Sequence, residues 1–398
     1  MDLAIVFRAD HTKNQTAEGR LVTSLCEDVY AIAGVQLRTI RERLTRRSEA
    51  LVQAVGVIFK NLYEKQISAR DRFCTDLETC CAASNDFVRM SEKCEEIVGE
   101  IQDECNLSPE ATVTLEEQSA VLLGLYFSDG VHAAQKTHLY CFEPIEEAVA
   151  GEIFNEEWQE HLTNNELALT LVRTLDDFME DLETFLDEVM VQKCVEAQVA
   201  SSVNFYIRCL LTKSAEHNSS RNSYFSNNER AISRMKGDVA VIRDYFETIA
   251  DESMPTLTRT IDKEFALLDT IIELLSIAAG VSRSDAHDFI LVLQKRVRNA
   301  SITRLVVGDL YHLMKPQDEH SLYELIDGME AEMLAMTDEK ALDTQDRNAV
   351  PGLRADEVMA THCANSERKR PAGPGNLDRA EAALRRMSVW GGGKASGE

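Results

Sequence analysis

Two pairs of side chains in this sequence have a spacing at which they could share a metal ion. Glu157 and His161 are one helical turn apart, and so are His138 and Cys141. Each pair would lie on one face of a helix. A protein zinc site needs three or four converging ligands, and neither pair supplies more than two. We therefore interpret these residues as structural and predict neither a metal nor a cofactor.

The motifs of the common enzyme classes are absent from the sequence. It contains no Gly-x-Ser-x-Gly elbow, no phosphate-binding P-loop, no His-Glu-x-x-His pair and no Gly-rich dinucleotide fingerprint. Asp176 and Asp177 are adjacent, so on a helix they point to different faces and cannot flank one substrate as an acid and a base. We predict that the chain is not an enzyme and assign no catalytic residue.

Amphipathic helices dominate the later half of the sequence. In one stretch the apolar residues recur at alternating intervals of three and four, which places them on one helix face: Ile232, Met235, Val239, Ile242, Phe246 and Ile249. Pro255 opens a second such helix and Gly280 closes it, and a third contains Phe289, Ile290 and Leu293. Short turns between the three helices favour antiparallel packing.

Polar residues before the helices predict where two of them begin. Ser226 precedes Glu229 by three residues, and Ser282 precedes Asp285 by three. That spacing is typical of a capping box, in which the first side chain accepts a hydrogen bond from an early amide of the helix. We expect helices to start directly after Ser226 and Ser282.

The rest of the chain is predicted to follow the same helical scheme, interrupted once. A first helical block covers residues 17–104, with breaks near Arg47, Ser68 and Ser84. Residues 106–152 contain Pro and Gly at short intervals, so we expect shorter helices and a hinge there. Regular periodicity returns in one predicted helix through Leu175, Phe178, Leu182, Phe185 and Val189. A last helical pair is expected around residues 305–314 and 322–336.

These patterns give the predicted fold class, which is all-α: an elongated rod of stacked antiparallel helical bundles with a disordered C-terminal tail. The expected domains are a first bundle at 1–150, which includes the irregular segment 106–152, and a second helical-bundle region at 151–338. The tail, 339–398, has no apolar stripe and is rich in Gly and charged residues. Within it Ser388 follows Arg385 and Arg386, a possible phosphorylation site or a chance match.

The formal net charge of −26 is concentrated in one section. Between residues 92 and 190, 25 Asp and Glu residues stand against Lys93, Lys136 and Arg173. Such a field repels nucleic acid and anionic lipid and attracts a basic protein, although it is also typical of a plain solvated face. We predict no nucleic-acid partner.

One basic cluster has the opposite sign. It consists of arginines on a single predicted helix and just after it: Arg38, Arg41, Arg43, Arg46 and Arg47. A basic helical face could contact anionic membrane lipids; the alternative is a solvated face that makes salt-sensitive ion pairs, because Glu42 and Glu49 lie among the arginines.

The ten cysteines lack a Cys-x-x-Cys pair and are expected to be buried thiols in a reducing compartment. With no secretory signal pattern at residues 1–13, we expect a cytoplasmic protein.

Several of these helices resemble those of a known family. The segments 229–246 (ERAISRMKGDVAVIRDYF) and 282–290 (SRSDAHDFI), and more loosely 173–190 and 204–211, resemble the C-terminal region of exocyst complex component three, the Sec-six family of vesicle-tethering subunits. The resemblance covers roughly residues 10–335 and is strongest in the later half. None of the matching segments carries a catalytic motif.

The resemblance implies a function in exocytosis. Family members form rods of helical bundles, pair with exocyst component four, contact SNARE proteins, and hold secretory vesicles at the plasma membrane before fusion. It therefore implies a cytoplasmic protein that lies peripherally at exocytic sites of the plasma membrane. In the family a coiled-coil N-terminal half precedes the matching region, so we expect a truncated gene or a divergent paralogue. The alternative is a helical adaptor that binds a small GTPase and has no function in secretion.

Overall fold

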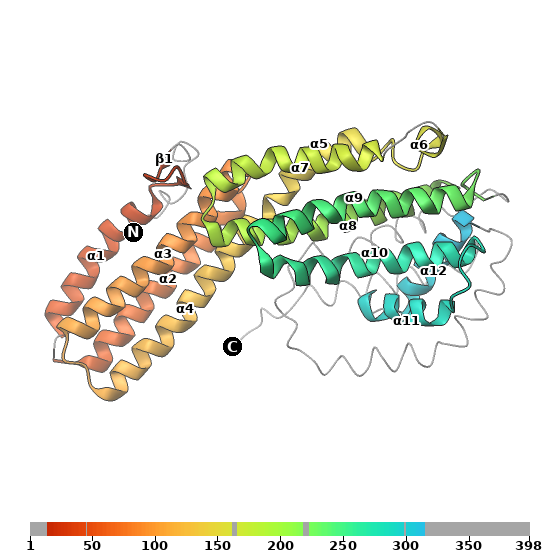
Figure 1. The fold of residues 1–398 in the computed structure, drawn as a ribbon. Coiled ribbons are helices and arrows are strands. Elements are labelled where there is room, and N and C mark those ends of the chain that lie inside the picture. The colour runs from red at the N-terminus through yellow and green to blue at the C-terminus, as the bar shows by residue number, and fades with distance from the viewer. Residues whose placement is uncertain (1–13, 45, 161–164, 218–222, 298–299, 315–398) are drawn as a thin grey trace, which may run out of the picture. The chain divides into compact units, whose positions relative to one another are not determined.

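The computed structural model describes residues 14–44, 46–160, 165–217, 223–297 and 300–314. Helices make up nearly all of these residues, which confirms the all-α prediction (Figure 1). One two-residue ladder is present, in which β1 (Asn14–Gln15) pairs antiparallel with β2 (Leu21–Val22). The tail with Ser388 and the predicted helix at 322–336 lie outside the described residues.

The chain divides into two compact units. Unit 1 comprises Met1–Val149, Thr170–Val199 and Ile249–Leu257, and unit 2 comprises Ala150–Leu169, Ala200–Thr248 and Thr258–Glu398. The predicted division into consecutive domains stays a prediction. In the described part of the chain, no helix combines the length and the apolar character that crossing a membrane requires.

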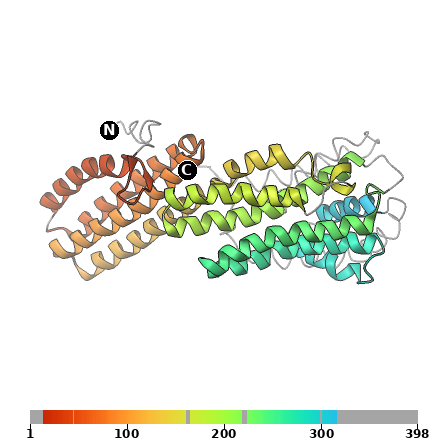
Figure 2. The same cartoon turned by 45° about the horizontal axis from the view of Figure 1, so that its top comes forward.

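Unit 1 contains a bundle of four long helices that lie side by side in both views (Figures 1 and 2). They are α1 (Leu25–Leu44), α2 (Ser48–Phe73), α3 (Leu77–Glu104) and α4 (Pro109–Lys136), followed by α5 (His138–Val149). Their inward stripes form one apolar core, whose buried members include Leu51, Val55, Phe87, Met90, Ile101, Leu115, Leu122 and Tyr126. Burial of such stripes is the main force that stabilises a helical bundle.

Polar caps fix the starts of α3 and α4. Asp76 accepts a hydrogen bond from the Thr79 amide at 2.8 Å, while the Thr79 hydroxyl accepts one from the Asp76 amide at 3.1 Å. Ser108 caps α4, with Pro109 in the first turn. The predicted break near Arg47 is correct, but those near Ser68 and Ser84 are wrong, because α2 and α3 run through both positions and the chain breaks at residues 74–76 instead.

The shorter helices expected at 106–152 are found only at its end, where α5 follows α4 after Thr137, and the expectation is wrong for residues 109–136. Residues Pro109–Lys136 form one continuous helix of 28 residues that contains Gly124 and Gly130. Packing favours Gly130: a Cβ there would lie 3.3 Å from the Ser84 carbonyl oxygen and 3.4 Å from the Phe87 Cβ, which is tighter than an ordinary van der Waals contact. The close approach of α4 to α3 offsets the roughly 1 kcal/mol by which glycine disfavours a helix.

The predicted stripe through Leu175 and Val189 belongs to two helices. α7 (Glu166–Phe185) buries Leu175 and Leu182 as expected, but it ends at Phe185, and α8 (Glu188–His217) begins three residues later. Val189 is 50% exposed, so its inclusion in the stripe is wrong. The Asp187 carboxylate accepts a hydrogen bond from the Val189 amide at 3.0 Å, which starts α8 in a new direction.

Unit 2 contains α6 (Glu156–Glu160), most of α9 (Asn228–Glu252), and α10 (Thr258–Ala278), α11 (Ala286–Val297) and α12 (Ala300–Met314). A 3-10 turn at Pro255–Leu257 precedes α10, and Gly280 follows it with a φ of 74°, both as predicted. α10, α11 and α12 pack on one another through buried residues that include Ile261, Phe265, Leu268, Ile271, Ile290, Leu293, Leu310 and Leu313.

The capping residues of unit 2 differ from those predicted. Asn227, not Ser226, accepts a hydrogen bond from the Arg230 amide at 2.9 Å. Ser226 instead donates its own amide to the Gln159 side chain at 3.0 Å. At α11 the Asp285 carboxylate accepts from the His287 amide at 3.0 Å, so Asp285 is the cap and the expected function of Ser282 is wrong.

Candidate interaction surfaces and buried polar clusters

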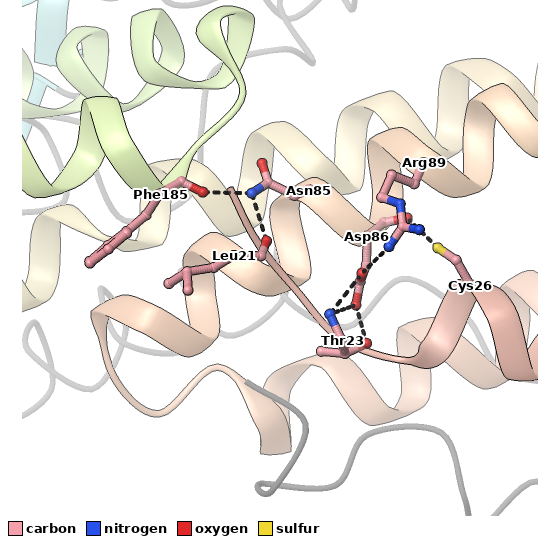
Figure 3. Close-up of polar contacts among 7 residues, drawn as sticks. All are labelled: Leu21, Thr23, Cys26, Asn85, Asp86, Arg89 and Phe185. Atoms are coloured by element: carbon pink, nitrogen blue, oxygen red, sulfur yellow. Dashed lines mark hydrogen bonds and ion pairs between the residues drawn. The ribbon is translucent and has the colours of Figure 1, made fainter. Parts of the chain in front are cut away.

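Asn85 joins three segments of unit 1 from the middle of α3 (Figure 3). Its amide nitrogen donates to the carbonyl oxygens of Leu21, at 2.8 Å, and Phe185, at 2.7 Å. Its amide oxygen accepts from the backbone nitrogen of Asp187 at 2.9 Å. One side chain therefore fixes both the short β2 strand and the turn between α7 and α8 against α3.

Asp86, the next residue, anchors the segment that leads into α1. The Thr23 amide donates to both carboxylate oxygens, at 3.1 and 3.3 Å, and the Thr23 hydroxyl donates to Oδ2. Arg89 Nη1 lies 4.0 Å from Asp86 Oδ1, and Cys26 Sγ donates to the Asp86 carbonyl at 3.5 Å (Figure 3). With 1% of its surface exposed, Asp86 is closed to a ligand and acts as an anchor.

Unit 2 buries a second carboxylate, Asp238 of α9, among aromatic rings. Trp158 Nε1 and the Tyr206 hydroxyl each donate to Asp238 Oδ2 at 3.1 Å. Burial raises the pKa of Asp238 to about 6, although both donors and Arg234 oppose that rise. The Arg234 guanidinium lies 5.1 Å from the centre of the Trp158 ring, within cation–π range.

Packing of the rings explains an unusual backbone conformation beside this cluster. Phe154 has a φ of 63° and is fully buried. Its ring meets those of Trp158 and Tyr206 edge to face, each at 5.0 Å between centres. Such contacts offset the strain of a left-handed non-glycine residue, which costs on the order of 1–3 kcal/mol. The cluster therefore fixes α6 on α8 and α9.

The residues with metal-ligand spacing do not form a site where they are described. His138 Nδ1 interacts with the Gln135 carbonyl, and burial lowers the pKa of the imidazole. Cys141 contacts the Gln198 amide at 3.8 Å, and His161 lies outside the described residues. No group of three or more potential ligands converges in the described part of the chain. Asp176 and Asp177 are both exposed.

The cysteines of the described residues behave as predicted. Nine are free and buried. Burial raises the pKa of Cys194 to about 12 and that of Cys81 well above its ordinary value, so these thiols stay protonated.

Within the described residues, one of the five arginines on and just after α1 forms ion pairs, and the other four do not. Arg41 pairs with Glu100, at 3.6 Å, and with Glu104, both on α3, so it stabilises the bundle. The other four arginines are exposed, and no ion pair involves them within the described ranges: Arg38, Arg43, Arg46 and Arg47. Membrane contact by these four stays a prediction.

Together these observations define a helical-bundle protein whose conspicuous polar groups are internal anchors. No known protein-family profile matches the sequence. Among solved structures, the chain is similar to the crystal structure of the C-terminal domain of the exocyst subunit Sec6p, with a TM-score of 0.65 and 12% sequence identity, over 86% of each chain. At this identity the likeness shows a shared fold.

Proposed function

We propose that this chain is a non-enzymatic subunit of an exocyst-type tethering complex, which docks secretory vesicles at the plasma membrane. The observation that carries the proposal is the fold likeness to the Sec6p domain, which extends over 86% of both chains. The resembling segment 229–246 lies within α9, where Ile232, Met235 and Val239 are buried. The resembling segment thus includes core residues of the helix.

The mechanism is one of binding and positioning. A tether needs a rigid scaffold with surfaces for several partners, and the buried anchors on α3 and α9 supply that rigidity. The proposed partners are other exocyst subunits, first of all component four, together with SNARE proteins. The site of action is the cytoplasmic face of the plasma membrane.

Recovery of the complex tests this proposal. The full chain, tagged at its own locus, is purified after mild cross-linking, and the bound proteins are quantified by mass spectrometry. We expect several exocyst subunits to be enriched together over an untagged control. Recovery of a small GTPase without any exocyst subunit would replace the tether with the adaptor alternative.

Membrane contact has its own test. We expect R38E/R43E/R46E to weaken binding to sedimented vesicles that contain anionic inositol lipids by on the order of a hundredfold, because each basic residue near such a surface contributes about 1 kcal/mol. Arg41 is left unchanged, since it pairs with Glu100 and Glu104. The matched control is K60E/K65E on α2, where both lysines are also exposed. Equal sedimentation of all three proteins would remove the membrane from the proposal.

A further inference from the structure

The outward face of α4 is apolar over a stretch in which a surface helix is normally polar. Among its exposed residues, Val113 is 53%, Val121 66%, Leu125 41% and Phe127 46% exposed. Val121, Leu125 and Phe127 lie within two turns, with the small exposed residues Ala120 and Gly124 between them. Val113 lies two turns before Val121, and the exposed Glu117 stands between these two valines. The opposite face of α4 fills the core of unit 1 through Leu115, Leu122 and Tyr126. This helix therefore has apolar surface on two sides.

The neighbours of α4 leave that outward face uncovered within unit 1. α4 packs on α3 and, to a lesser extent, on α2, and it lies at the edge of the bundle in both views (Figures 1 and 2). Isolated exposed valines also occur elsewhere, as at Val35 of α1 and Val57 of α2. The group formed by Val121, Leu125 and Phe127 with Ala120 and Gly124 is different, because clustered apolar surface indicates an interaction site and single residues do not.

Acidic side chains lie on and beside the same face, and Glu117 is one turn from both Val113 and Val121. Glu116 and Glu117 are exposed one turn before Ala120. The Gln102 side chain donates to Glu116 at 3.1 Å, and Ser84 donates to the Gly130 carbonyl at 2.8 Å, so α3 and α4 run antiparallel with a known register. That register places the exposed Glu95, two turns before Gln102 on α3, at the level of Val121.

Positive charge does not balance these carboxylates. Between residues 109 and 135, α4 contains no Lys or Arg. On the neighbouring helices, Lys60 pairs with Glu64 at 3.8 Å, Arg70 with Asp129 of α4 at 2.6 Å, and Lys93 with Glu96. Lys65 of α2 is exposed, and it stands against the three carboxylates Glu95, Glu116 and Glu117. The apolar stripe is therefore bordered by unbalanced negative charge, which favours a partner with basic residues on both sides of an apolar stripe.

We propose that the outward face of α4, from Val113 to Phe127, binds an amphipathic helix of another protein that carries Lys or Arg beside its apolar residues. A partner helix that matches this stretch needs about 14 residues, or roughly 21 Å. A second copy of this chain would bring Glu95, Glu116 and Glu117 against their own equivalents. Anionic lipid would be repelled in the same way. The inference rests on the α4 surface and is independent of the tethering proposal.

Binding of a defined peptide by the full chain tests this inference. The probe is a fluorescent peptide of about 14 residues in which Leu repeats with helical spacing and Lys fills the flanks. Its anisotropy is followed on titration with the protein. We expect binding that weakens with salt, no binding of the same peptide with Glu in place of Lys, and weaker binding of a scrambled peptide.

Two matched variants distinguish the apolar face from general charge attraction. V121D/L125D is expected to weaken binding at least about tenfold, because it removes the apolar contact, although the added carboxylates would strengthen purely electrostatic attraction. V35D/V57D adds the same charge at exposed valines of α1 and α2 and is expected to bind as the unchanged protein does. E95Q/E116Q/E117Q should weaken binding and reduce its salt dependence.

Several outcomes would overturn the inference. Equal binding by V121D/L125D and V35D/V57D would mean that the peptide follows net charge alone. The inference would also fail if V121D/L125D abolished self-association in sedimentation or binding to anionic vesicles, since the face would then serve those contacts. If V121D/L125D fails to fold by circular dichroism, V121A/L125A replaces it. Recovery of exocyst subunits in cells is scored separately, so failure of either proposal leaves the other standing.

Discussion

Each of the two compact units contains an aspartate that is 1% exposed on a long helix, and these two carboxylates are held differently. Asp86 of unit 1 accepts from the backbone and hydroxyl of Thr23, in the segment that leads into α1. Asp238 of unit 2 accepts from Trp158 and Tyr206, and its Oδ1 has no hydrogen-bond partner within the described residues. One unit thus uses a buried acid to fix backbone, and the other uses it to orient rings.

The difference has an electrostatic consequence. Backbone amides that point at a carboxylate are fixed donors and stabilise its charge. Two ring donors on a single oxygen compensate less of the lost hydration, and burial accordingly raises the pKa of Asp238 to about 6. Unit 2 therefore contains a group that titrates near neutrality, which makes the stability of its core dependent on pH.

The largest effect is expected from substitutions of Asn85, which anchors three segments of unit 1. N85D keeps the shape of the side chain but turns its two N–H donors into acceptors that face the Leu21 and Phe185 carbonyls. We expect a loss of about 4 kcal/mol in the free energy of unfolding, against about 2 for N85A. Urea unfolding measures the loss, and hydrogen exchange at residues 21–23 locates it. Unchanged exchange there would mean that Asn85 is not an anchor.

A smaller effect is expected from D238N, and it depends on pH. Between the ordinary value of 3.8 and a native pKa of about 6, the native protein keeps a proton that the unfolded chain has released. The stability of the unchanged protein therefore falls as the pH rises through this window and stays lower above it. Relative to D238N, we expect it to lose up to about 3 kcal/mol between pH 4 and 7.

Unfolding of both proteins at a series of pH values measures this difference. D244N, at an exposed position of α9, is the matched control: it keeps Asp238, so its stability should follow that of the unchanged protein across the series. A constant difference between D238N and the unchanged protein across the series would show that Asp238 does not titrate in this window.

The smallest expected effect comes from Y206F, which removes one donor from Asp238 and keeps the ring. We expect a loss of about 1 kcal/mol at pH 7. Because the Tyr206 hydroxyl lowers the pKa of Asp238, its removal should move the midpoint of the pH dependence upward. A midpoint that moves downward, or does not move, would contradict the hydrogen bond from Tyr206.

The helices of unit 2 were largely predictable from local pattern. The residues Ile232, Met235 and Val239 recur at helical spacing, and all three are buried in α9. The exact caps were not predictable, since Ser226 and Asn227 are adjacent and both are good caps. Gln159 decides between them by accepting from the Ser226 amide, and it lies 67 residues away in the sequence.

The buried anchors of unit 1 were not predictable from the sequence. The polar run at Ser84, Asn85 and Asp86 suggests a helix break, but it lies in the middle of α3. Its partners Thr23 and Phe185 are 63 and 100 residues away, so no local spacing indicates them. Gly130 led to the wrong prediction of an irregular segment for a related reason. This glycine allows α3 to pack closely on α4, and only the tertiary structure shows that contact.

The nine buried thiols of the described residues allow local opening of the structure to be measured. A thiol reacts with maleimide as the thiolate, and burial keeps groups such as Cys81 and Cys194 protonated and inaccessible. Labelling of the native chain at these positions should therefore proceed only as fast as the surrounding helices separate. Mass spectrometry of labelled peptides would then rank the helices by local stability, with Cys26 reporting on the segment beside Asp86 and Cys209 on α8.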